Sequence, residues 1–125
     1  MTENEISKII IDCAFRIHKR FGPGLLESVY EKLIIYELTK TGLNIRNQVG
    51  VPIKYDDKII DLGFRVDIIV ENKVIIELKS VKDILPVHKK QLLTYLKLSE
   101  LKLGLLINFN VNLIKDGIKR IVNKL

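Results

Sequence analysis

The 125-residue sequence has very little cysteine and no long apolar run. A single thiol, Cys13, excludes an intrachain disulfide and a thiolate metal cluster, and its place on an apolar stripe predicts a buried small side chain. No segment approaches the roughly 20 apolar residues that a membrane-spanning helix needs. The first residues, M-T-E-N-E-I-S-K, are acidic and polar where a secretory signal is basic and then apolar, so we expect a cytoplasmic protein without membrane association.

The sequence also contains no internal repeat, linker or low-complexity segment, and its length fits one domain spanning residues 1–125. It lacks the helix-turn-helix, zinc-finger and aromatic sheet motifs of dedicated nucleic-acid readers. Hydrophobic residues make up 47% and charged residues 29%, which is typical of a globular protein and excludes a disordered chain.

The charge is unbalanced, with a formal net charge of +6. Basic residues gather at Arg16-x-x-Lys19-Arg20, at Lys89-Lys90 and in residues 115–124. Such a balance suits a polyanionic partner, but lysine-rich surfaces also serve solubility alone. Charge therefore supports a nucleic-acid partner without establishing one.

Helical periodicity dominates the first third of the chain. A capping box at Thr2-x-x-Glu5 and apolar residues at helical spacing predict a helix over residues 3–20. Gly22-Pro23-Gly24 ends it, and a second helix is predicted over residues 26–39. The side chains predicted to face inward from this second helix are Leu26, Val29, Tyr30, Leu33, Ile34 and Leu38.

Beyond residue 45 the pattern changes to strands. Residues 48–55, 59–70 and 74–79 predict a three-stranded antiparallel meander, in which Pro52 should lie at an edge or beside a bulge because it lacks an N–H. A helix over 87–99 and a buried strand over 102–109 follow, and Asp116-Gly117 predicts a terminal β-hairpin or short return strand. The sequence thus predicts an α/β (α+β) fold.

Three charged residues interrupt the apolar strands of this meander. Glu77 and Lys79 are two residues apart and therefore share one face of their strand. A three-residue loop over 71–73, with Asn72 or Lys73 at positive φ, would place Asp67 directly opposite Glu77. A two-residue loop would place Asp67 opposite Ile76 and separate the charges. We predict the three-residue loop.

Two opposed, partly buried carboxylates repel each other, and a divalent cation would remove that penalty. Oxygen ligands without nearby His or Cys favour Mg²⁺ or Mn²⁺ over Zn²⁺. Lys79 would then orient or help deprotonate a water, or balance the charge on a phosphate under attack. The alternative is that Lys79 forms an ordinary ion pair with Asp67 or Glu77 on a solvated face.

Together these features resemble the PD-(D/E)XK nuclease superfamily, whose core runs helix, three-stranded meander, helix, strand. More narrowly, the sequence is similar to the small GxxExxY family placed in that superfamily. The phrases that carry the resemblance span nearly the whole chain: G-P-G-L-L-E-S-V-Y-E, V-I-I-E-L-K-S-V, P-V-H-K-K-Q-L-L-T-Y-L and G-L-L-I-N-F.

The resemblance implies a restriction-endonuclease-like core and a set of site residues. Asp67, Glu77 and Lys79 match the superfamily motif, Glu27 matches a glutamate that completes the metal site, and the Leu78 carbonyl is an implied further ligand. The resemblance also implies Mg²⁺ (or Mn²⁺) as cofactor. Val66 stands where the superfamily name has proline, and the short gap from Asp67 to Glu77 leaves no room for an inserted recognition loop.

The helix after the meander carries a second implied group. Gln91-x-x-x-Tyr95 resembles a motif of exonuclease-like branches that orients the scissile strand, and His88 shares its helix face. The alternative is a helix that packs on the sheet with Tyr95 in the core. Tyr30 would either orient Glu27 through its hydroxyl or only pack.

We therefore predict a metal-dependent nuclease that hydrolyses phosphodiester bonds of DNA or RNA. The alternative is a catalytically silent nucleic-acid-binding or protein-interaction module with the same fold. The expected partner is nucleic acid. A homodimer is a further expectation, because pairing extends the reach of a small catalytic core.

Overall fold

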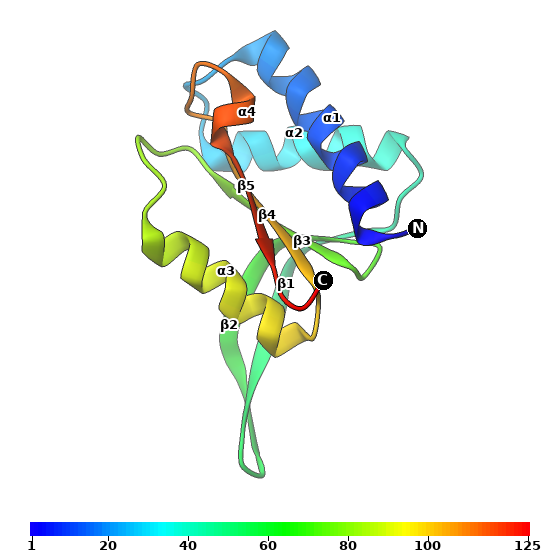
Figure 1. Cartoon of the computed structure of the whole chain (residues 1–125), viewed down its shortest axis with the longest axis vertical. Coiled ribbons are helices and arrows are strands. Elements are labelled where there is room, and N and C mark those ends of the chain that lie inside the picture. Colours follow the sequence, from blue (N-terminus) through cyan, green and yellow to red (C-terminus); the bar gives the residue numbers. More distant parts are fainter.

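A five-stranded mixed sheet forms the centre of the computed structural model, with helices on both of its faces (Figure 1). The structure describes the backbone of residues 1–125 and the side chains of residues 1–61 and 63–125. Its helices are α1 (Glu3–Phe21), α2 (Glu27–Lys40), α3 (Pro86–Ser99) and α4 (Ile114–Gly117). Its strands are β1 (Ile45–Tyr55), β2 (Lys58–Val70), β3 (Val74–Lys79), β4 (Leu103–Asn108) and β5 (Ile118–Val122). Within this description, no helix combines the length and apolarity needed to cross a membrane.

Helix α1 begins and faces the core as its sequence predicts. The Thr2 hydroxyl accepts a hydrogen bond from the Glu5 N–H, and Glu5 accepts one from the Thr2 N–H, which completes the capping box. Cys13 is fully buried on the apolar stripe of this helix. Local sequence therefore determines both the start and the orientation of α1.

Helix α2 buries a narrower face than its apolar residues predict. Tyr30, Ile34 and Leu38, spaced four residues apart, are its fully buried side chains. The inward placement predicted for Leu26 and Val29 is wrong, because these side chains are 72% and 38% exposed. Leu26 is the N-cap and precedes the helix, so the helical periodicity does not apply to it.

The strand order is β1-β2-β3-β4-β5, and it confirms the antiparallel meander of the first three strands. The connection through α3 makes β4 parallel to β3, and β5 then returns antiparallel to β4. The return strand is confirmed, but Asp116-Gly117 is not its hairpin turn, because both residues belong to the single-turn helix α4. Gly117 is needed there for packing, since a Cβ would clash with the Asn108 carbonyl.

Two hydrophobic clusters lie on opposite faces of the sheet. One face packs against α1, α2 and α4 through side chains that include Ile68, Ile76 and Ile107. The other packs against α3 through side chains that include Ile75 and Leu106. The sheet is therefore covered on both faces, which explains the near-continuous apolar sequences of β3 and β4.

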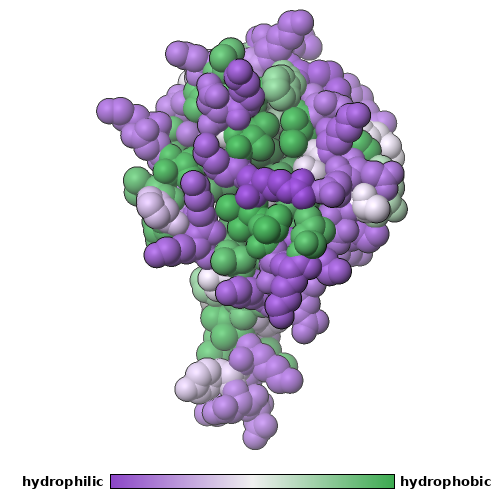
Figure 2. Space-filling view, viewed as in Figure 1, coloured by the Kyte–Doolittle hydropathy of each residue, from purple (hydrophilic) through white to green (hydrophobic). Residues whose placement is uncertain are grey.

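Strands β1 and β2 continue past the core as a two-stranded arm (Figure 1). Its two-residue turn joins Tyr55 to Lys58, with Asp56 at positive φ. The pairing register shifts between Val51 and Ile53, and β1 is an edge strand, so both expectations for Pro52 are confirmed. Figure 2 shows hydrophobic surface along the arm and hydrophilic surface at its end.

Candidate active site

The three predicted charged residues lie where β2 and β3 separate. The register pairs Val70 with Val74 and Ile68 with Ile76, which confirms the three-residue loop. Positive φ is found at Asn72, as expected, and also at Glu71. Regular pairing ends at Ile68 and Ile76, one residue before Asp67 and Glu77. We call this place the β2–β3 fork.

At the fork, carboxylates take the place of main-chain acceptors. The Asp67 N–H donates to Glu77 Oε1 at 3.0 Å. The Leu78 N–H donates to Asp67 Oδ2 at 2.8 Å. Each carboxylate therefore binds the main chain of the opposite strand, so the two acidic side chains meet as the sequence predicts.

A backbone irregularity turns β2 at this point. Val66 and Ile68 are two residues apart, and in a regular strand they would share a face. Instead, Val66 packs with the α3 cluster and Ile68 with the α1 and α2 cluster. Asp67 lies between them, where the strand changes faces, and this change keeps its side chain out of both hydrophobic clusters.

Glu77 is the most deeply buried carboxylate of the site, with 8% of its surface exposed. Burial raises the pKa of Glu77 to about 8, and the negative charge of Asp67 adds to the increase. The Asp67 N–H bond and the Lys79 charge lower this pKa, while Glu27 raises it. The Glu77 carboxyl therefore carries a proton at neutral pH unless a cation replaces that proton.

Glu27, the first residue of α2, joins the site from the neighbouring helix. It lines a cavity of about 200 Å³ together with Asp67 and Leu78. Its charge reaches Glu77, as the effect on the pKa of that residue shows. The fold thus brings Glu27 and the fork into one cleft.

Lys79 is half-buried at the end of β3, next to the fork. Its charge lowers the pKa of Glu77, so the ammonium lies within electrostatic reach of that carboxylate. Between side chains that the structure describes, both salt bridges involve Glu37, and Lys79 takes part in neither. The ordinary ion pair considered as an alternative for Lys79 is therefore not formed.

The donor set at the fork suits a hard divalent cation. No group of three or more His, Cys, Asp and Glu side chains converges on a metal position in the described part of the chain. Mg²⁺, however, usually binds one or two carboxylates and completes its shell with water or phosphate oxygens. Asp67 and Glu77 each use one oxygen in the fork bonds. The other Asp67 oxygen accepts only a long hydrogen bond of 3.5 Å from Gln48 Nε2, so it and Glu77 Oε2 retain lone pairs for a cation. The residues present therefore fit such an ion.

Helix α3 brings one of its predicted residues to the site. Tyr95 is buried against Phe64, with ring centroids 4.9 Å apart, and this placement confirms its core role. Burial raises the pKa of Tyr95, and the charges of Glu77 and Asp67 raise it further, so its ring also lies near the fork.

The other two polar residues of this helix face differ from Tyr95. Gln91 is exposed on α3. His88 has a structural role instead, because its Nδ1 accepts a hydrogen bond from the Leu85 N–H at the helix start. Of the residues on this helix face, Tyr95 therefore lies near the fork, and His88 caps the start of α3.

Tyr30 does not orient Glu27 through its hydroxyl. The side chain is fully buried and stacks on Phe109, with ring centroids 4.2 Å apart. Its hydroxyl donates to the Gly22 carbonyl at 2.6 Å and accepts from the Leu25 N–H at 3.2 Å. Tyr30 therefore stabilises the turn that precedes Glu27 and has no exposed surface with which to contact substrate.

Two polar residues of the same cleft were not predicted from the sequence. Glu31 and Gln48 line the cavity beside Asp67, and Gln48 Nε2 donates to Glu31 Oε1 at 2.7 Å. Glu31 follows Glu27 by four residues, so helical spacing could have identified it. Nothing in the sequence distinguishes Gln48.

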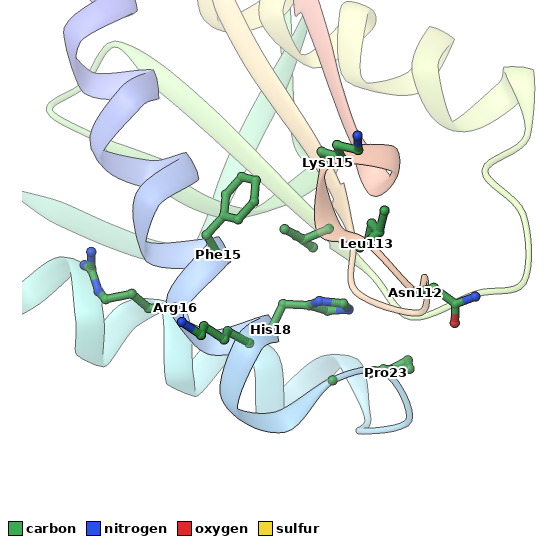
Figure 3. Close-up of a pocket in the computed structure, with 10 residues that line it drawn as sticks. Phe15, Arg16, His18, Pro23, Asn112, Leu113 and Lys115 are labelled. Carbon is green, nitrogen blue, oxygen red and sulfur yellow. The ribbon is translucent and has the colours of Figure 1, made fainter.

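A mainly apolar cavity of about 500 Å³ lies away from the fork (Figure 3). Phe15 and His18 of α1 face the segment around Leu113 across it (Figure 3). The His18 Nε2 donates to the Val111 carbonyl at 2.8 Å, so the ring ties α1 to this segment. None of the predicted site residues lines this cavity.

A polar cavity of about 240 Å³ lies beside the end of β3. Lys82, Lys89 and Lys119 line it, and so do Asp83 and Asp116. Asn108, which also lines it, is the β4 partner of Lys79. Lysines of the two predicted basic segments thus meet near the end of β3, where they outnumber the aspartates by one.

The mixed sheet with helices on both faces is a restriction-endonuclease-like fold. A sequence model of the PD-(D/E)XK nuclease superfamily matches residues 4–121, so the chain belongs to this superfamily. A comparison with curated proteins found no match, and a comparison with solved structures also found none.

Proposed function

We propose that this protein is a metal-dependent nuclease that hydrolyses phosphodiester bonds of DNA or RNA. The observation that carries the proposal is the β2–β3 fork, where Asp67 and Glu77 bind each other's strands through one carboxylate oxygen each and keep lone pairs on the second oxygen for a cation. Membership of a nuclease superfamily supports phosphodiester hydrolysis as the reaction.

Nucleases of this superfamily generally use divalent metals, and Mg²⁺ or Mn²⁺ is the cofactor we propose. Asp67, Glu77 and the Leu78 carbonyl would hold the ion, and Glu27 would complete the set. When bound, the ion activates water and offsets negative charge on the phosphate.

The remaining residues act around this centre. Lys79, free of a salt bridge, would orient the water or balance charge on the attacked phosphate. Tyr95 supports the fork from α3, and Gln91, exposed on that helix, is available to a phosphate. Both carboxylates of the fork must be ionised to hold the cation, so cation binding displaces the proton of Glu77.

The net charge of +6, with Lys82, Lys89 and Lys119 near the end of β3, supports a nucleic-acid substrate. Within the superfamily, we infer membership of the GxxExxY family from the phrase Gly24 to Tyr30. We also propose a homodimer. The arm formed by β1 and β2 exposes Tyr55, Ile59 and Ile60, and this apolar surface could form the contact between two copies.

A cleavage assay on single- and double-stranded DNA and RNA, with Mg²⁺ or Mn²⁺ and with EDTA, tests the proposed reaction. We expect cation-dependent cleavage by the wild-type protein and at least hundredfold slower cleavage by Asp67→Ala and Lys79→Ala, because each removes a group from the reacting centre. Lys97→Ala, at the other end of α3, is the control and should retain activity.

Cleavage that survives both substitutions would place the activity outside the fork. Salt-sensitive binding without turnover under every cation condition would instead favour a silent binding module. Equilibrium sedimentation of the same preparations tests the homodimer separately.

A further inference from the structure

Gln48 has a backbone conformation that its position does not explain. Its φ is 51°, a left-handed value that non-glycine residues adopt at a cost. The other non-glycine residues with positive φ lie in turns, at a helix end or near the C-terminus: Asp56, Glu71, Asn72, Glu100 and Lys124. Among the described residues, Gln48 alone adopts this conformation in the middle of a strand.

The irregularity lies directly opposite Asp67. Asn47 pairs with Ile68 and Val49 pairs with Val66, so Gln48 faces Asp67 across the β1–β2 ladder. Arg65 holds the strained residue from the partner strand, because its Nη1 donates to the Gln48 carbonyl at 3.3 Å. Both strands therefore depart from regular geometry at the same rung, next to the fork.

The side chain of Gln48 lies between two carboxylates. Its Nε2 donates to Glu31 Oε1 at 2.7 Å and lies 3.5 Å from Asp67 Oδ1. The other Asp67 oxygen, Oδ2, already accepts the Leu78 N–H. Gln48 is thus the side chain that faces the Asp67 oxygen left free by the fork.

The charges of Glu31 and Asp67 explain why an amide is suited to the position of Gln48. Burial raises the pKa of Glu31, the hydrogen bond from Gln48 lowers it, and the charge of Asp67 raises it. Glu31 and Asp67 would repel each other across the cavity without a donor between them. A neutral amide supplies that donor without adding charge.

We propose that Gln48, anchored by Glu31, is a positioning residue that directs Asp67 Oδ1 towards the cation of the site. This proposal rests on the proposed function and adds two residues to it. In the left-handed conformation, the Gln48 side chain contacts both Glu31 of α2 and Asp67 of β2, which gives the strained backbone a role at the site.

Isothermal titration with Mn²⁺ in the absence of nucleic acid tests the role directly. Gln48→Gly keeps the left-handed backbone accessible and removes the amide, and Gln48→Met keeps the side-chain length and removes the donor. We expect both variants to bind Mn²⁺ roughly 10- to 100-fold more weakly, as for other residues that orient metal ligands. Asp56→Gly, at the arm turn with φ of 54°, is the matched control and should bind normally.

A double-mutant cycle tests whether Glu31 is the anchor. Glu31→Leu should weaken Mn²⁺ binding, and adding it to Gln48→Gly should have little further effect, because the two side chains act as a unit. Full additivity would overturn the anchoring role. The same variants should lower kcat more than they change KM for nucleic acid.

Gln48→Gly removes the amide but keeps the left-handed backbone accessible. If this variant binds Mn²⁺ as tightly as the wild-type protein, the amide is not needed and the positioning role is overturned. Weak binding by Gln48→Gly with normal binding by Gln48→Met would also overturn it, because the donor would be dispensable. A wild-type protein that binds Mn²⁺ but cleaves nothing would contradict the proposed function and not this role.

Discussion

Glu77 and Asp67 have a structural role at the fork because each accepts a hydrogen bond from the other strand. Main-chain N–H groups that have left the ladder are thereby satisfied, at the cost of holding two carboxylates close together. The same bonds hold the two side chains in place. Because burial and the charge of Asp67 raise the pKa of Glu77, the fork is more stable when a proton or a cation offsets its negative charge.

The raised pKa of Glu77 predicts how the free energy of unfolding depends on pH when EDTA removes divalent cations. Glu77 has a folded pKa of about 8 against an ordinary value of 4.5, so the folded state binds more protons than the unfolded state between these values. As far as this group is concerned, the free energy of unfolding should therefore be highest at and below pH 4.5 and fall as the pH rises towards 8. The slope is on the order of 1 kcal/mol per pH unit at most.

Urea denaturation at a series of pH values measures this dependence. Glu77→Gln is the control, because it keeps the shape without the titrating group and should flatten the curve. Adding Mn²⁺ should stabilise the wild-type protein more at pH 8 than at pH 6. A wild-type curve that rises between pH 6 and 8 in EDTA, beyond that of Glu77→Gln, would contradict the prediction.

Single residues show where sequence reasoning succeeded and where it could not. The three-residue loop was predicted from the sequence and the register confirms it, although regular pairing ends one residue before Asp67 and Glu77. These two residues are linked instead through the Asp67 N–H and the Glu77 carboxylate. The fork itself was not predictable, because nothing local indicates that regular pairing stops at Ile68. Gln48 escaped notice because its left-handed backbone depends on tertiary contacts with Arg65 and Glu31.

The elements were predicted more completely, since periodicity and caps are local. The bounds predicted for β3 are those observed. Those of α1 and α3 differ by one residue at one end, and those of α2 and β4 differ by one residue at both ends. Helix α4 was missed because four residues give no periodic signal. Its Gly117 was taken as a turn residue, whereas its lack of a side chain serves the close approach to Asn108.

At the element scale, the connection from β3 to α3 depends on Asn108 at the end of β4. Asn108 Oδ1 accepts from the N–H groups of Val81 and Asn110, and its Nδ2 donates to the Val81 carbonyl. The side chain is 2% exposed. It therefore holds the chain two residues beyond Lys79 at a fixed distance from the neighbouring strand.

Asn108→Ala should lower the free energy of unfolding by about 2 kcal/mol, because it leaves buried main-chain groups without partners. Cleavage should also slow, since the segment after Lys79 loses its tether. Chemical denaturation measures the first effect and the cleavage assay the second. Asn112→Ala, at an exposed neighbouring position, is the control; equal effects from both substitutions would refute the tethering role.

For the molecule as a whole, lysines line cavities at both ends of the sheet. The cavity at the end of β3 contains Lys82, Lys89 and Lys119 together with Asp83 and Asp116. The cavity near the start of β4 contains Lys97, Lys102 and Lys124 together with Glu100. The two ends of α3 therefore allow a direct comparison of charge near to and far from the site.

Lys89→Glu should weaken nucleic-acid binding and reduce the salt dependence of log K by about one unit of slope, because a phosphate contact is lost. Lys97→Glu makes the same charge change at the opposite end of the helix and should leave both quantities nearly unchanged. Fluorescence anisotropy across a salt series measures them. Equal losses from the two substitutions would indicate that net charge alone governs binding.

The bulge at Pro52 also limits how the molecule can associate. Strand β1 is an outer strand, and its free side would otherwise offer a continuous row of N–H and C=O groups to a strand of another chain. Pro52 has no N–H to offer, and the register shift beside it breaks the row into two short pieces. Pro52 and the irregular pairing therefore disfavour continuous strand pairing between two copies along β1, which acts against open-ended polymerisation through the arm.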